Sequence, residues 1–282
     1  MKKWFTLIVM TAVFFLASCQ TDSENEMRIV SLIPSNTEII AELGLLEDTV
    51  MVTTNDDYPK EVKSDKFKKI DPFNLEIEKV IAEKPTHIVS HESNNGLLKE
   101  DLEKIKEATG AEVLVVEDAA TVEDVFRDIR DVGIFLSREK EAGELLEKLN
   151  QDFEEVKRKA EGLDKIKTLA FISPPPEIYT VGENTFISNV FSHVNLVNIF
   201  GDLKDYPVVT NEEIIKRNPQ MSVNLTGLDA ESFEEIIREV PGFKSIDINK
   251  RENQCTPDVD LISRPGPRII EGMDALIECS NN

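Results

Sequence analysis

The chain has 282 residues, with 32 lysines and arginines against 54 aspartates and glutamates, which gives a formal net charge of −22. This length suits two domains, and a hydrophobic content of 40% is enough to bury a core, which excludes a chain that is disordered throughout. So acidic a chain also lacks the clustered positive charge with which proteins bind nucleic acid or an anionic lipid surface.

The first 18 residues have the pattern of an export signal. Lys2 and Lys3 precede an apolar run over residues 4–16, which is shorter than the roughly 20 residues that a membrane-spanning helix needs. Leu-Ala-Ser then stands directly before Cys19, an order that resembles the box at which bacterial lipoproteins are cleaved and lipidated. We predict a lipoprotein signal peptide over 1–18, lipidation of Cys19 and a polar tether over 19–27. The alternative is an ordinary signal peptide followed by a chance cysteine.

Strand and helix patterns alternate from residue 28 to residue 120. A β-branched run over 28–33 is stopped by Pro34, and helix-capping residue types follow it. Further strands are predicted at 49–53, 87–90 and 112–116, and helices at 75–84 and 99–109. Such alternation predicts an N-terminal lobe over 28–120 with a mostly parallel sheet covered by helices.

The pattern changes at residue 121, where strand signals and prolines stop. Apolar residues at helical spacing continue to residue 162, with Ser137 as a candidate cap in the middle. We predict a helical spine over 121–163 and a second α/β lobe over 164–282, in which strands at 168–172 and 221–225 alternate with helices at 187–194, 211–217 and 232–240, before a final strand and helix. The fold class is therefore α/β, with two lobes bridged by a long α-helix. The alternative for the spine is an ordinary pair of crossover helices.

The two halves share a short internal repeat. Glu78 begins a segment with two aliphatic residues at the second and third following positions, a proline at the seventh, and then a strand, and Glu212 begins an equivalent segment. A glutamate in the first turn of a helix is favoured by the helix dipole in any protein. Two glutamates at matched positions in the two halves could instead form a symmetric pair of acidic contacts for a partner protein.

Six landmarks in order make the chain resemble the substrate-binding lipoproteins of ABC importers for cobalamin, haem and iron–siderophores. They are RIVSLIPSNTE from residue 28, DYP from residue 57, the segment 78–85, TVG from residue 180, the segment 211–219 and RPGPR from residue 264. The resemblance covers residues 28 to about 276 and is nearest to the cobalamin-binding branch. It implies two lobes bridged by one long helix, with the ligand bound between them.

The resemblance also implies roles for particular residues. Glu78 and Glu212 match the two glutamates that dock on the permease dimer, which works with its ATPase. The ligand-binding candidates are residues in loops after strands, which meet at one edge of a parallel sheet: Ser35, Asn55, Phe73, His91, Tyr206 and Arg264. The implied ligand is a corrinoid or, alternatively, haem or a ferric siderophore, without a resident cofactor. The mature receptor is expected to be a monomer, exported and held by its lipid at the outer face of the cytoplasmic membrane or in the periplasm.

Two arginines and the histidines each have a possible binding role and a possible structural role. Arg264 is the stronger candidate for a ligand carboxylate, phosphate or amide, because a guanidinium reads such groups with two parallel bonds, whereas Arg268 could cap the last helix or pair with an acid. His91 could contact the ligand or its metal, or be a polar loop residue. Three scattered histidines without a carboxylate at ligand spacing make a poor site for a free metal ion, so none is predicted.

The two cysteines of the second lobe, Cys255 and Cys279, would meet an oxidising environment in an exported protein, and we predict that they form a disulfide. The alternative is two buried thiols. No nucleophile elbow, phosphate-binding loop or dinucleotide fingerprint occurs, so no catalytic residue and no enzyme activity is predicted. A surface hydrolase that uses Asp56 and Asp57, and a passive surface protein, are the remaining alternatives.

Overall fold

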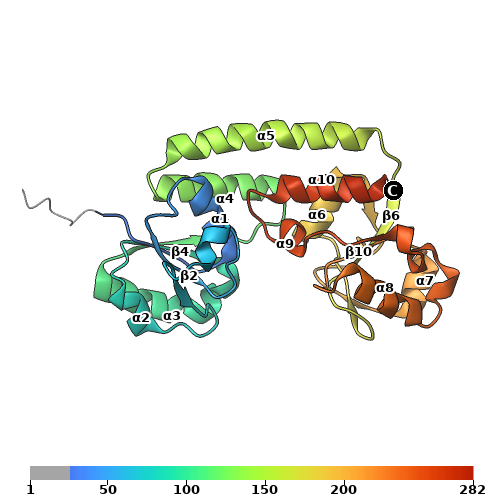
Figure 1. Ribbon diagram of the computed structural model, residues 1–282, viewed down its shortest axis with the longest axis horizontal. Coiled ribbons are helices and arrows are strands. Elements are labelled where there is room, and N and C mark those ends of the chain that lie inside the picture. The colour runs from blue at the N-terminus through green and yellow to red at the C-terminus, as the bar shows by residue number, and fades with distance from the viewer. Residues whose placement is uncertain (1–25, 282) are drawn as a thin grey trace, which may run out of the picture.

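The computed structural model describes residues 26–281. The predicted signal peptide, Cys19 and most of the predicted tether therefore lie outside the described residues. The described chain forms two lobes side by side beneath a long helix (Figure 1). Within this range no helix is both long and apolar enough to cross a membrane.

The N-terminal lobe is built on a five-stranded, all-parallel sheet in the order β3-β2-β1-β4-β5. Ile29 of β1 packs with the apolar side chains of α1, whereas the next residue, Val30, packs with those of α2 and α3. Successive side chains of a strand point to opposite faces, so helices cover both faces of this sheet, as the alternating sequence predicts. The elements are β1 (Ile29–Ser31), α1 (Pro34–Glu42), β2 (Thr49–Thr53), β3 (Lys68–Ile70), α2 (Ile77–Ala82), β4 (His87–His91), α3 (Glu92–Thr109) and β5 (Glu112–Val116).

Helix α3 begins seven residues earlier than the sequence analysis predicts. The predicted start at residue 99 is wrong because the polar segment after His91 looks like a loop, yet it is helical from Glu92. The imidazole of His91 caps the helix by accepting a hydrogen bond from the backbone N–H of Ser93, in place of the usual Ser, Thr, Asp or Asn. The helix ends, as predicted, before Gly110, whose φ of +75° suits a residue without a Cβ.

The spine consists of two antiparallel helices, α4 (Val122–Phe135) and α5 (Glu139–Glu161). A capping box starts α4, because Thr121 and Asp124 each accept the other's backbone N–H. The predicted cap at Ser137 is wrong: Ser137 has φ +54° in the turn, and Arg138 precedes α5 without a side-chain cap. A Cβ on Gly133 would lie 2.5 Å from the Cβ of Ala142, so the two helices touch there at a glycine. At about 1.5 Å per residue α5 is about 35 Å long and reaches across both lobes (Figure 1).

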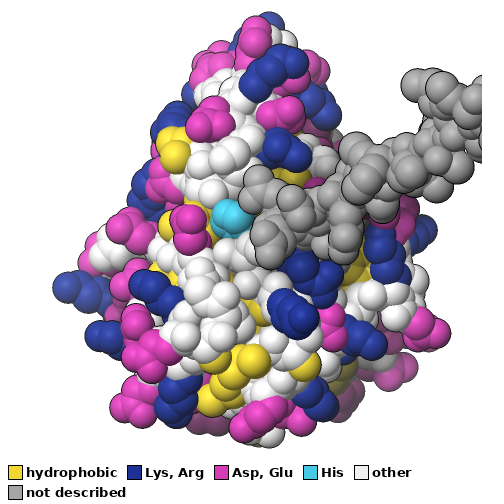
Figure 2. All heavy atoms as spheres, turned by 90° about the vertical axis from the view of Figure 1, so that its left-hand side faces the viewer, with side chains coloured by type: hydrophobic (Ala, Val, Ile, Leu, Met, Phe, Trp, Pro, Cys, Tyr) yellow, Lys and Arg dark blue, Asp and Glu magenta, His cyan; other side chains and the backbone are white. Residues whose placement is uncertain are grey.

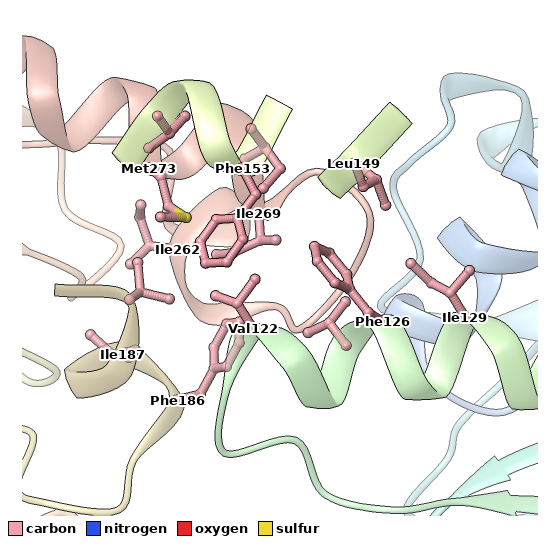
Figure 3. Packing of buried hydrophobic residues seen from close by; sticks show 14 of the residues in the cluster. Val122, Phe126, Ile129, Leu149, Phe153, Phe186, Ile187, Ile262, Ile269 and Met273 are labelled. Carbon is pink, nitrogen blue, oxygen red and sulfur yellow. The ribbon is translucent and has the colours of Figure 1, made fainter. Parts of the chain in front are cut away.

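One apolar cluster joins the spine to both lobes. Figure 3 shows side chains of α4, α5 and three helices of the C-terminal lobe meeting in this cluster. The rings of Phe126 on α4 and Phe153 on α5 meet edge to face, with their centroids 5.9 Å apart. The same cluster continues to Ile39 and Ile40 of α1, so no boundary in the core separates the spine from either lobe.

The C-terminal lobe contains a four-stranded parallel sheet in the order β11-β10-β6-β8 and a short antiparallel pair, β7-β9. A disulfide joins Cys255 of β11 to Cys279 of α10, which is the pair that the sequence analysis expects. The elements are β6 (Ile166–Phe171), β7 (Ile178–Tyr179), α6 (Phe186–His193), β8 (Leu196–Asn198), β9 (Val208–Val209), α7 (Asn211–Arg217), β10 (Met221–Asn224), α8 (Ala230–Glu239), β11 (Gln254–Cys255), α9 (Val259–Ser263) and α10 (Ile269–Ser280).

The four strands of the second sheet follow the same order as β2, β1, β4 and β5 of the first. In each, the first strand pairs with the strand that follows the repeated segment: β1 with β4, and β6 with β10. The repeat extends to the backbone, because Lys84 and Asn218 both adopt a left-handed conformation, with φ of +48° and +53°, directly before the proline. The internal repeat in the sequence therefore corresponds to equivalent structure in the two lobes.

Charge is mixed rather than segregated on the end of the N-terminal lobe. Figure 2 shows acidic and basic side chains interspersed over that face. The excess of acids is therefore not gathered into one patch there.

The buried carboxyl of Asp128 on α4 should make stability depend on pH. Burial, together with the charges of Asp124 and Asp131, raises the pKa of Asp128 to about 6, although Arg127 hydrogen-bonds to it. Between about pH 4 and pH 6 the folded protein holds this proton and the unfolded chain does not, so the group's contribution to stability falls by about 2–3 kcal/mol as the pH rises.

We expect Asp128→Asn to remove this slope when urea unfolding is measured at pH 4, 5, 6 and 7. The exposed substitution Glu147→Gln on α5 is the control and should keep the slope of the unmodified protein. An Asp128→Asn variant whose stability changes with pH as the unmodified protein's does would contradict the assignment.

Candidate functional site

The two lobes enclose a cavity of about 420 Å³ between them. The N-terminal lobe contributes Ile33, after β1, and His91 and Ser93, at the junction of β4 and α3. The segment 118–120, which leads from β5 to the spine, closes one side. The C-terminal lobe contributes residues 184–187, 205–206, Ser263 and Pro265. A cavity at the carboxyl ends of parallel strands, walled by two lobes, is a common place for a small-molecule site.

His91 is nine-tenths buried in the wall of this cavity and is neutral near pH 7. Burial lowers the pKa of His91, and the nearby carboxylates of Asp118 and Glu92 only partly offset this effect. Its Nδ1 lies 3.2 Å from the backbone nitrogen of Ser93, 2.9 Å from the Ser93 hydroxyl and 3.4 Å from a carboxylate oxygen of Asp118.

Tyr206 lines the cavity from the opposite lobe, is 49% exposed and keeps its hydroxyl proton. Burial, followed by the charges of Asp118 and Asp205, raises the pKa of Tyr206. Its loop is held by backbone hydrogen bonds from Gly182 N–H to the Asp205 carbonyl at 2.7 Å and from Glu183 N–H to the Leu203 carbonyl at 2.6 Å. A Cβ on Gly182 would lie 2.4 Å from the Leu203 carbonyl oxygen. The glycine of the TVG landmark is therefore required for the loop that presents Tyr206.

Of the six predicted ligand-binding residues, only His91 and Tyr206 line this cavity. Ser35 is buried in the first turn of α1, and Asn55 is exposed in the loop after β2. Phe73 follows β3 and is 71% exposed. The roles of these residues in binding stay predictions. Phe186 and Asp118 also line the cavity, and no motif in the sequence marks them.

Arg264 lies at the junction of the lobes and has three carboxylate partners. Its Nη1 donates to Glu38 at 2.7 Å and to Asp57 at 3.1 Å, and its Nη2 lies 2.9 Å from a carboxylate oxygen of Asp260. Burial alone would lower the pKa of Arg264, but the carboxylates raise it. In turn, the hydrogen bond and charge of Arg264 overcome burial and lower the pKa of Asp57. The predicted role of Arg264 in ligand binding must therefore compete with these contacts.

Arg268 binds the same buried glutamate with two parallel hydrogen bonds. Its Nε and Nη2 donate to the two carboxylate oxygens of Glu38 at 3.0 and 2.6 Å, and this bond raises the pKa of Arg268. Its guanidinium also lies 3.9 Å from the ring centroid of Tyr58. Arg268 thus pairs with an acid, one of the two simpler roles weighed for it from the sequence. We call Glu38, Asp57, Asp260, Arg264 and Arg268 the Glu38 cluster.

The two adjacent aspartates that could form a catalytic pair have separate structural partners. Asp56 is buried and accepts hydrogen bonds from the backbone N–H and the hydroxyl of Thr53, whereas Asp57 pairs with Arg264. Over residues 26–281 no three His, Cys, Asp or Glu side chains are grouped so that they could hold a metal ion.

Glu78 and Glu212 are exposed and occupy the same position, the second residue of α2 and of α7. Neither has an ion-pair partner within 4 Å among the described residues. The structure thus places one available carboxylate at the equivalent site of each lobe.

Comparison with known proteins agrees with this architecture. The model of the periplasmic binding protein family matches residues 29–248. The chain belongs to this family. An uncharacterized ABC transporter substrate-binding lipoprotein of Bacillus subtilis, YvrC, is 36% identical over 261 residues, which are 92% of this chain and 81% of YvrC. The protein is therefore a solute-binding component of an ABC transporter, and members of this family are non-enzymatic.

The chain is also similar to one further protein in sequence and to one solved structure. A vitamin B12-binding protein of Vibrio parahaemolyticus is 25% identical over 270 residues, covering 94% of this chain and 92% of that protein. A crystal structure described as a possible iron-binding, periplasmic solute-binding protein of Staphylococcus epidermidis matches with a TM-score of 0.82 and 36% identity, covering 89% of this chain and 97% of that one. This periplasmic binding protein and its relatives share the two-lobe fold.

Proposed function

We propose that this protein is the lipid-anchored receptor of an ABC importer and that it captures a corrinoid between its two lobes. The observation that carries the proposal is the lining of the cavity. It offers the aromatic rings of Phe186 and Tyr206, hydrogen-bond donors on His91 and Tyr206, and the carboxylates of Asp118 and Asp205. No lysine or arginine between residues 26 and 281 lines it.

This lining suits a corrinoid better than a polyanion. A flat macrocycle presents apolar faces to aromatic rings, and its amide side chains can accept hydrogen bonds from His91 and Tyr206. Haem carries two propionates, which the two cavity carboxylates would repel without a nearby cation. The similarity to vitamin B12-binding proteins supports the same choice.

A ferric siderophore is the second candidate. It is supported by the 36% identity to the Staphylococcus epidermidis protein that is described as possibly iron-binding. Because the described residues group no metal-holding set of side chains, the iron would arrive within its organic chelate. The acidic lining would favour a neutral or positively charged chelate over an anionic one.

Titration of the full chain in detergent distinguishes these ligands. We expect cyanocobalamin to bind when followed by calorimetry and absorbance, and haemin and a ferric hydroxamate to bind at least tenfold more weakly. Tyr206→Ala should weaken cyanocobalamin binding about tenfold, since losing an aromatic contact costs about 1 kcal/mol or more.

The control is Tyr179→Ala, a tyrosine that is 38% exposed, against 49% for Tyr206, and that does not line the cavity. It should bind as the unmodified chain does. Tight binding of haemin or the ferric hydroxamate without binding of cyanocobalamin would overturn the corrinoid assignment and leave the transporter class intact.

The proposed partner surface is formed by Glu78 and Glu212, which would dock on basic residues of the permease dimer. The equivalent positions and free carboxylates of the two side chains support this proposal. The lipid on Cys19 would hold the receptor at the outer face of the cytoplasmic membrane, as expected if the lipoprotein character of YvrC extends to this chain.

We expect the double variant Glu78→Lys and Glu212→Lys to abolish uptake of the bound ligand in cells while leaving the dissociation constant of that ligand unchanged. Charge reversal would place lysines against the basic permease residues. The matched control reverses two exposed glutamates in the first turns of other helices, Glu61→Lys and Glu231→Lys, and should keep uptake. Normal uptake by the Glu78/Glu212 variant would refute the docking assignment.

A further inference from the structure

The Glu38 cluster joins two parts of the chain whose bonded residues are 207 to 230 positions apart. Glu38 belongs to α1, which packs with β1 and the spine in the N-terminal lobe. Arg264 and Arg268 flank the turn between α9 and α10, and both helices pack on α6 in the C-terminal lobe. The three hydrogen bonds between Glu38 and the two arginines are therefore direct bonds between the lobes.

The cluster is buried and its geometry is specific. The side chain of Glu38 is 2% exposed, and those of Arg264 and Arg268 are 12% and 13% exposed. A buried carboxylate is costly unless it is paired and fully hydrogen-bonded, so the turn must stay within reach of Glu38. The backbone is close as well, because a Cβ on Gly266 would lie 3.4 Å from Oε2 of Glu38.

The same turn forms a wall of the cleft. Ser263 and Pro265 line the cavity between the lobes. Pro267 and Arg268 line a second hollow of about 390 Å³, together with residues of α5 and with Glu42 of α1. The segment 263–268 thus separates the ligand cavity from the underside of the spine, and the bonds to Glu38 fix its distance from the N-terminal lobe.

We propose that Glu38 is a positioning residue for ligand binding: by holding the 263–268 turn against the N-terminal lobe, it sets the width of the cleft. Arg264 then acts on the ligand through the shape of the cavity rather than by direct contact. Asp57 and Asp260 form the remaining ion pairs of Arg264. The effect on ligand affinity rests on the proposed function, whereas the effect on lobe spacing does not.

Distances between the lobes test the proposal without any ligand. Spin labels would be attached to the full chain at Glu107→Cys on α3 and Lys244→Cys in the C-terminal lobe, both exposed positions. We expect Glu38→Gln to broaden and shift the distance distribution measured by pulsed electron paramagnetic resonance. Arg264→Lys keeps the positive charge but loses the two parallel donors of the guanidinium, so it should change the distance distribution less than Glu38→Gln does. It replaces Glu38→Gln in the experiment if that variant does not fold.

The control is the double variant Cys255→Ser and Cys279→Ser, which removes a crosslink within the C-terminal lobe and should lower the melting temperature without changing the distances. With cyanocobalamin as the probe, the dissociation constant should rise at least fivefold in Glu38→Gln and less than twofold in the control.

A purely structural role predicts a lower melting temperature with unchanged distances and affinity, and that result would overturn the proposal. If the unmodified chain does not bind cyanocobalamin, the corrinoid assignment fails, and the distance measurement still decides the role of Glu38.

Discussion

The two lobes depend on one continuous set of apolar contacts around α4 and α5. Val122, Phe126 and Ile129 of α4 belong to one cluster with Phe153 of α5 and side chains of α6, α9 and α10 (Figure 3). The same cluster reaches α1 on the spine-facing side of the N-terminal sheet. Each lobe also has its own cluster on the far face of its sheet. Burial of apolar surface is the main favourable term in folding, so a core shared in this way couples the lobes to each other.

This coupling explains where the ligand cavity lies and how it is kept open. Because α5 reaches across both lobes, the spine defines the separation between them (Figure 1). The Glu38 cluster adds a polar bond between the lobes at the junction, directly beside the cavity wall.

Local patterns allowed much of this fold to be predicted from the sequence. Alternating strands and helices, the proline-free segment after residue 120, the Glu-to-Pro repeat and the two cysteines of one lobe each depend on neighbouring residues or on composition. The start of α3 was missed because the imidazole of His91 replaces a standard cap. The bond between Arg264 and Glu38 could not be predicted, because the two residues stand 226 positions apart and no spacing rule reveals such a pair. Cavity residues such as Phe186 are set by the packing of the lobes rather than by a motif.

Calorimetry of thermal unfolding tests the shared core most directly. If the spine joins both lobes into one cooperative unit, the full chain should unfold in a single transition whose calorimetric and van't Hoff enthalpies agree. Two resolved transitions, one for each lobe, would contradict the account, because they would show that the cluster around α4 and α5 does not couple the lobes.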